Sequence, residues 1–191
     1  MYGWSREYLG SASLEPHPCI GLCMNDARIE ALVQQDIPGR EAICALAGEV
    51  YGPYTRGERP LPQSFFSPEG LRIFMETGRI CYYPEDLVRR CSPEECRDFL
   101  REILAAVEGG ETAFTVIDSD KFRTPLNVEI IKADEQQLVV QRFNDDSQRL
   151  NIVIIDEPAI CEAFSDFFDY LPESDLTLSR EAMIDLLKSY L

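Results

Sequence analysis

The sequence predicts a mixed α/β protein in which a central mixed or antiparallel sheet is flanked by helices. Three observations support this class. A capping-box pattern, Ser-Pro-Glu-Glu at residues 92–95, opens an amphipathic helix. Short apolar runs separated by polar turns fill residues 113–155, and two amphipathic patterns end the chain. With 191 residues, 45% of them hydrophobic, the chain can build a core without metal ions or disulfides.

The N-terminal third reads as a lead-in, a strand and two helices. Residues 1–17 carry turn-formers and little periodicity, so we expect a loose segment there. Residues 19–24 form a short apolar run typical of a buried strand. Asn25 can cap the helix that follows, which ends before Pro38-Gly39, and residues 40–51 repeat a helical pattern.

A candidate boundary follows this second helix. Residues 52–63 are rich in Pro, Gly and Arg and lack apolar periodicity, which indicates an exposed loop or a joint. We therefore predict an N-terminal unit over residues 1–62 and a larger unit over residues 63–191. The alternative is one continuous domain over residues 18–191.

The larger unit continues the alternation of helices and strands. Ser67 and Pro68 open a helix that ends near Thr77, and residues 80–83 read as a strand. The helix behind the capping box extends to about residue 108. Its predicted buried stripe consists of Phe99, Leu100, Ile103, Leu104 and Val107.

Four strands and two helices complete the prediction. The strand-like runs are residues 113–117, 127–131, 138–143 and 150–155, and the last three are close enough to form an antiparallel meander. A helix over residues 157–171 should bury Ile160, Phe164, Phe167 and Phe168. A final helix over residues 179–191 should bury Met183, Leu186 and Leu187.

Charge and composition restrict the partners and the compartment. A net charge of −16 repels phosphate backbones and anionic lipid, so we expect no direct nucleic-acid contact by this chain. The charge suits either a solvated surface or a basic protein partner. Seven cysteines, an odd number, are typical of a reducing compartment. We find no signal-peptide pattern and no apolar run of membrane-spanning length, so we expect a soluble cytoplasmic protein without membrane contact.

The pattern of reactive residues does not predict an enzyme, a metal site or a cofactor. A single histidine, His17, cannot supply a two-histidine site. Neither the Cys19/Cys23 pair nor the Cys91/Cys96 pair has zinc-knuckle spacing. Asp118-Ser119-Asp120 favours a turn over a magnesium site, and no glycine-rich phosphate loop is found. One alternative stays open, a reactive thiol at Cys91 whose pKa the neighbouring Arg89 and Arg90 could lower.

Several segments of the C-terminal two-thirds share a pattern with a known group of proteins. They are residues 66–71 (FSPEGL), 76–79 (ETGR), 127–130 (NVEI), 157–160 (EPAI) and 163–174 (AFSDFFDYLPES). Over roughly residues 65–191 the chain resembles the C-terminal regulatory region that follows an N-terminal helix-turn-helix in a group of bacterial transcriptional regulators. The resemblance implies a sensor or dimerisation domain, with itself as partner, a small-molecule effector, and DNA contact made by another segment.

A sensor requires an apolar concave site with a few polar groups. From residue type we expect it between the helix over residues 157–171 and the sheet. The candidate ligand-binding residues are Tyr82, Tyr83, Arg142, Phe164, Phe167 and Phe168. The principal alternative function is an acidic inhibitor or immunity-type protein that masks a basic partner, which would give a complex with steep salt dependence.

Overall fold

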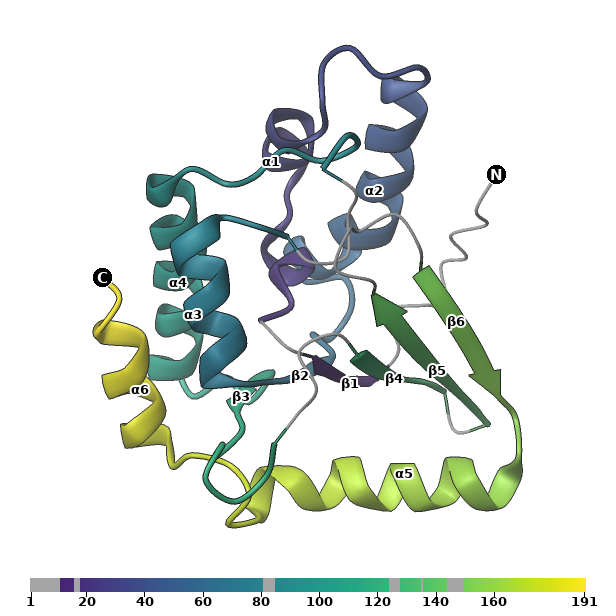
Figure 1. Ribbon diagram of the computed structural model, residues 1–191, viewed down its shortest axis with the longest axis vertical. Helices are drawn as coiled ribbons and strands as arrows, with labels where there is room; N and C mark the ends of the chain where they lie inside the picture. Colours follow the sequence, from purple (N-terminus) through teal and green to yellow (C-terminus); the bar gives the residue numbers. More distant parts are fainter. Residues whose placement is uncertain (1–10, 16–17, 81–84, 124–127, 135, 144–149) are drawn as a thin grey trace.

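The computed structural model describes residues 11–191 except residues 16–17, 81–84, 124–127, 135 and 144–149. It confirms the mixed α/β class, because the described residues form a six-stranded sheet with helices on both faces (Figure 1). The strand order is β3-β2-β1-β4-β5-β6. The strands are β1 (Ala12–Glu15), β2 (Gln63–Phe66), β3 (Phe114–Val116), β4 (Val128–Asp134), β5 (Gln137–Phe143) and β6 (Leu150–Ile155).

One half of the sheet is parallel. β1 pairs with β2, and β2 with β3, in parallel register, so each connection must cross over the sheet. The crossovers carry the helices that cover one face. They are the 3₁₀ helix η1 (Ile20–Cys23), α1 (Asp26–Leu32), α2 (Arg40–Thr55), α3 (Pro68–Thr77) and α4 (Pro93–Glu108).

The other half is the predicted antiparallel meander of β4, β5 and β6. β4 joins it to the parallel half by pairing antiparallel with β1, for example Leu14 with Ile130. The chain then turns from β6 into α5 (Pro158–Tyr170), the short 3₁₀ helix η2 (Leu171–Glu173) and α6 (Arg180–Lys188). Helix α5 crosses the second face of the sheet, while α6 packs beside α4 (Figure 1).

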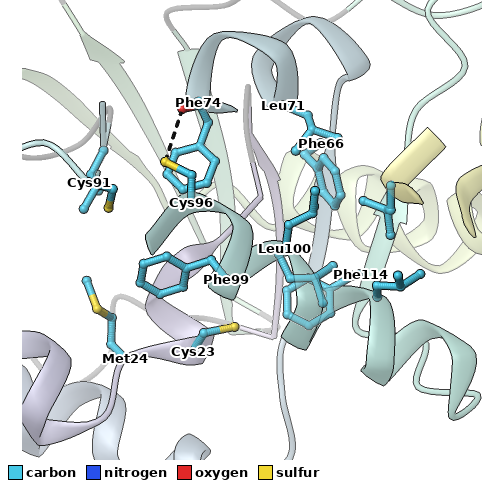
Figure 2. Packing of buried hydrophobic residues seen from close by; sticks show 14 of the residues in the cluster. Cys23, Met24, Phe66, Leu71, Phe74, Cys91, Cys96, Phe99, Leu100 and Phe114 are labelled. Carbon is cyan, nitrogen blue, oxygen red and sulfur yellow. Dashed lines mark hydrogen bonds between the residues drawn. The ribbon is translucent and has the colours of Figure 1, made fainter. Parts of the chain in front are cut away.

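Alternation along the strands creates one core on each face. Phe66 belongs to the larger core, which lies under the crossover helices and draws residues from Cys23 to Leu187, on both sides of residues 62 and 63. Phe65 points the opposite way, into a smaller core beneath α5. Figure 2 shows the centre of the larger core, where Phe74 and Phe99 meet edge to face at 6.3 Å between ring centroids.

The predicted helix starts are confirmed by their caps. Asn25 accepts the Arg28 amide at 3.0 Å, and Ser67 accepts the Gly70 amide at 3.0 Å. Ser92 and Glu95 form both halves of the capping box that opens α4. Its five predicted stripe residues are all buried. Local sequence therefore determines where these helices begin.

The N-terminal prediction is wrong in two places. Residues 12–15 were expected in a loose lead-in but form β1, which pairs on both sides within the sheet. Residues 19–24 were expected as a strand, yet residues 20–23 form η1, and the Met24 amide bonds to the Gly21 carbonyl at 3.1 Å. A Cβ at Gly21 would lie 2.5 Å from Tyr51 Cε1, so this glycine permits the close packing of η1 on α2.

Three further features differ from the prediction. α2 continues through Pro53 to Thr55, and the expected loop over residues 52–63 is shortened further by β2. Ile80 lies outside any strand, and the rest of the expected strand at 80–83 lies outside the described residues. Ile160 was expected in the core but is 41% exposed.

Candidate functional site

The outer edge of the meander is the most open part of the sheet. Among the described residues, β6 pairs with β5 alone and is the last strand of the sheet, so one side of the strand faces outward (Figure 1). Its sequence from 150 to 155, LNIVII, contains no charged residue. Such an apolar, uncharged edge offers unpaired backbone groups for another strand.

The apolar residues at the centre of the strand are exposed. Ile152, Val153 and Ile154 are 46%, 55% and 49% exposed. Val153 pairs with Val140 and Ile154 with Val139, so successive side chains project on alternate faces of the sheet. The strand thus presents apolar side chains above and below its free edge.

The opposite edge of the sheet is closed by the chain itself. The Leu178 amide donates to the Val116 carbonyl at 2.9 Å, and the Asp118 amide donates to the Leu176 carbonyl at 2.8 Å. Ile117 and Thr177 form an isolated antiparallel bridge. Within the described part of the chain, no comparable backbone segment lies along β6.

A second unusual feature lies at the seam between the two halves. Glu15 at the end of β1 is 1% exposed, and Glu129 on β4 is 8% exposed. The β1–β4 register, continued by one residue from Leu14 and Ile130, brings the two carboxyl groups opposite each other. Glu15 Oε1 accepts hydrogen bonds from Ser13 Oγ at 2.6 Å and from Ser64 Oγ at 3.0 Å.

This environment disfavours the charged form of the Glu129 carboxyl. Burial, and then the negative charge of Glu15, raise the pKa of Glu129 well above its usual range. The fold therefore favours the neutral form of the Glu129 carboxyl more strongly than the unfolded chain does, while Ser13 and Ser64 donate to the neighbouring Glu15 carboxyl. A pair of this kind can exchange a proton, but its burial keeps substrates away from Glu15.

Neither β6 as an open edge nor the carboxyl pair was predicted as a site. The sequence predicted a strand over residues 150–155 but not the strand order, which decides whether an apolar strand lies inside or outside the sheet. Ser13 and Glu15 alternate with Ala12 and Leu14 along β1, and all four residues are buried. A polar side chain in the sequence does not indicate that its position is buried, so the sequence did not predict this pair.

Three of the predicted ligand-binding residues lie together in the smaller core, and Arg142 is exposed on β5. Phe168 is buried and lies 6.0 Å from Phe65 between ring centroids, and Phe167 lies 6.4 Å from Phe164. These α5 rings pack on one another and on the sheet as part of the smaller core. Tyr82 and Tyr83 lie outside the described residues.

The alternative of an exposed thiol at Cys91 with a lowered pKa is contradicted by the structure. The side chain is 6% exposed within the larger core (Figure 2). Its interaction with the Cys96 thiol, together with burial, raises the pKa of the Cys91 thiol above its usual range. Arg89 acts elsewhere, because its guanidinium donates to both carboxylate oxygens of Glu95. Cys91 is therefore a packed, protonated thiol rather than a nucleophile.

A shallow groove of about 600 Å³ runs between α1 and α2. Four acidic residues line it, Asp26, Glu30, Glu41 and Glu49, together with Arg40 and Arg56. Arg56 is paired with Glu58 at 2.7 Å, and Arg40 donates to the Glu30 carbonyl at 2.5 Å. The acidic side chains therefore dominate the charge of this surface.

The predicted turn after β3 is confirmed. Asp118 Oδ1 accepts the Asp120 amide at 3.1 Å, and Lys121 lies over the Asp118 carboxylate. Among the described residues, no group of three or more His, Cys, Asp or Glu side chains is placed to hold a metal ion. No helix in the described segments has the length and apolar character needed to cross a membrane.

Comparisons with protein-family models, with curated proteins and with solved structures gave no match to this chain. The candidate site therefore depends on the geometry of the chain alone.

Proposed function

We propose that this chain is a non-catalytic regulatory domain that acts by protein association, as expected for the effector region of a bacterial transcriptional regulator. The observation that carries the proposal is the open, uncharged edge strand β6, whose three central side chains are 46–55% exposed. Exposed apolar edges of this kind are normally shortened, charged or covered, unless another chain pairs with them.

Two further features support a regulatory role. The chemically unusual groups, Glu15, Glu129 and Cys91, are all at least nine-tenths buried, so they are poorly placed to meet a substrate. The net charge of −16 disfavours contact with a phosphate backbone. A domain that associates with protein, and leaves DNA binding to another segment or subunit, satisfies both observations.

Chromatin immunoprecipitation tests this function. The chain is epitope-tagged at its own chromosomal locus, and enrichment at a small set of promoters is expected, with altered transcripts of those genes after deletion. The purified chain alone should leave the same promoter fragments unshifted in a gel assay. The absence of both promoter enrichment and transcript change would refute the proposal.

The acidic groove between α1 and α2 favours a second candidate function, an inhibitor or immunity-type protein that binds a basic partner. Glu41 and Glu49 lie on the α2 side of the groove. A lysine-rich peptide followed by fluorescence anisotropy should bind at low salt and dissociate at high salt. Binding that is equal for the wild-type chain and for Glu41→Gln/Glu49→Gln would exclude the groove.

A further inference from the structure

We propose that β6 pairs antiparallel with β6 of a second copy of this chain, in a two-fold register centred on Val153. This inference rests on the proposed function and specifies its partner. The sheet would then continue from one copy into the other across the free edges of the two β6 strands. In this register Val153 faces Val153, and Ile152 of each copy faces Ile154 of the other.

The charge pattern of the strand indicates a second copy rather than a charged partner. A basic partner would require acidic residues on the contacting strand, but residues 150–155 carry none. A two-fold interface presents the same surface on both copies, so every residue must tolerate its own counterpart. An uncharged apolar strand meets that condition, because no like charges come to lie opposite each other.

Exposure determines the centre of the register. Val153 is the most exposed of the three central residues at 55%, and Ile152 and Ile154 flank it at 46% and 49%. A two-fold axis at Val153 places both isoleucines against apolar partners on one face of the joined sheet. It places the two Val153 side chains, with Cβ atoms about 5 Å apart, on the other face.

Salt dependence separates this partner from a basic one. Two copies that each carry a net charge of −16 repel each other outside the contact, and added salt screens this repulsion. The dimer should therefore strengthen as salt is added. A complex with a basic protein should weaken under the same change.

The test combines two opposite charges at Val153. Sedimentation velocity on the wild-type chain should show a concentration-dependent species of twice the 21.7 kDa monomer mass. Val153→Lys and Val153→Glu each place like charges opposite each other, so each should raise the dissociation constant about tenfold or more. An equimolar mixture of the two variants should restore the dimer, because the opposite charges then face each other.

Controls and a second variant keep the result interpretable. Tyr170→Lys and Tyr170→Glu make the same changes at a 57% exposed aromatic near the far end of α5, and both should leave the dimer intact. The double variant Ile152→Lys/Ile154→Glu keeps opposite charges facing each other in the proposed register and should remain dimeric. Circular dichroism verifies that every variant is folded.

Several outcomes would overturn the inference. A wild-type chain that stays monomeric at all concentrations, folded Val153 variants that still dimerise, or a mixture that stays monomeric would each do so. None of these results bears on promoter enrichment in the cell. The regulatory function could therefore survive the loss of this interface, and the interface could survive the loss of the regulatory function.

Discussion

The two edges of the sheet differ in whether another segment of the described chain hydrogen-bonds to them. At the β3 edge, residues 176–178 return and bond to the backbone on either side of Ile117, while helices cover the adjacent face. At the β6 edge, β5 is the only strand partner that the described part of the chain supplies, and the central side chains are about half exposed. A single protein thus closes one edge and leaves the other open, although closing an edge protects it from unwanted pairing.

This difference shows that an uncovered edge is not common to both sides of the sheet, because the β3 edge is covered by the chain's own C-terminal segment. The C-terminal segment that closes the β3 edge is short, and it achieves closure with a few backbone hydrogen bonds before α6 packs against α4. The chain has no equivalent segment along β6 in its described part. The open edge is therefore the place where association with another chain demands least rearrangement.

The largest expected effect comes from the same substitution on each edge strand. Val116→Ala removes two methylene equivalents from a side chain that is 0% exposed and leaves a cavity, so it should lower the free energy of unfolding by about 2–3 kcal/mol. Val153→Ala at a 55% exposed position should change it by about 0.5 kcal/mol or less in the monomer. Urea unfolding at low protein concentration measures both values. Equal losses would show that the two edges are similarly buried in solution.

Local sequence signals predicted much of the fold. The capping residues Asn25, Ser67 and Ser92 marked three helix starts, because a cap is decided by neighbouring residues. The meander was predicted from close spacing of its strands. β1 escaped prediction because its burial depends on pairing with β2 and β4, which lie far along the chain.

The candidate site was harder to predict than the helices, because it depends on which segments distant in the sequence lie side by side. An apolar strand in the sequence can be central or peripheral, and only the strand order places β6 outside. The meeting of Glu15 with Glu129 joins residues more than a hundred positions apart. The sequence left a reactive Cys91 open as an alternative because of its two arginine neighbours, but Arg89 instead pairs with Glu95, and tertiary packing buries the thiol.

The seam between the two halves should respond to pH in a way that neither edge does. The folded state raises the pKa of Glu129, so the folded protein binds a proton at this carboxyl more tightly than the unfolded chain does. In the unfolded chain the carboxyl has a pKa of about 4.3. Stability should therefore fall as pH rises from about 4.3 through the raised pKa. Glu129→Gln removes this loss and should raise the free energy of unfolding at neutral pH relative to the wild-type chain.

Glu95 provides the control of opposite sign. Its hydrogen bonds from Arg89, aided by the Ser92 amide and hydroxyl, lower its pKa to about 2 in the folded state. The stabilisation that ionised Glu95 contributes to the fold is fully present above a pH of about 4.3 and is lost as the pH falls towards 2. Thermal unfolding across this pH range should show that, at neutral pH, Glu129→Gln is more stable than the wild-type chain and Glu95→Gln is less stable. A destabilised Glu129→Gln at neutral pH would mean that Glu129 is ionised in the fold.

A small effect on stability is expected at the closed edge, where Lys121 forms a clamp with Asp118 and Asp175. Lys121 donates to the Asp175 carbonyl at 2.8 Å and lies 3.5–3.7 Å from the Asp175 and Asp118 carboxylates, so it ties the turn after β3 to the closing segment. Its side chain is 46% exposed, and Lys121→Met should therefore lower stability by only about 0.5–1 kcal/mol. Hydrogen exchange gives the local readout.

The amides of Leu178 and Asp118, whose bonds close the edge, should exchange faster in Lys121→Met. The amide of Val139 in β5 provides the reference, because its strand is paired on both sides and lies away from the clamp, and its exchange should not change. If all three amides keep their wild-type rates, the backbone hydrogen bonds and the packing of α6 are sufficient to close this edge. The contrast with β6 would then arise from the path of the C-terminal segment rather than from the ion pairs that accompany it.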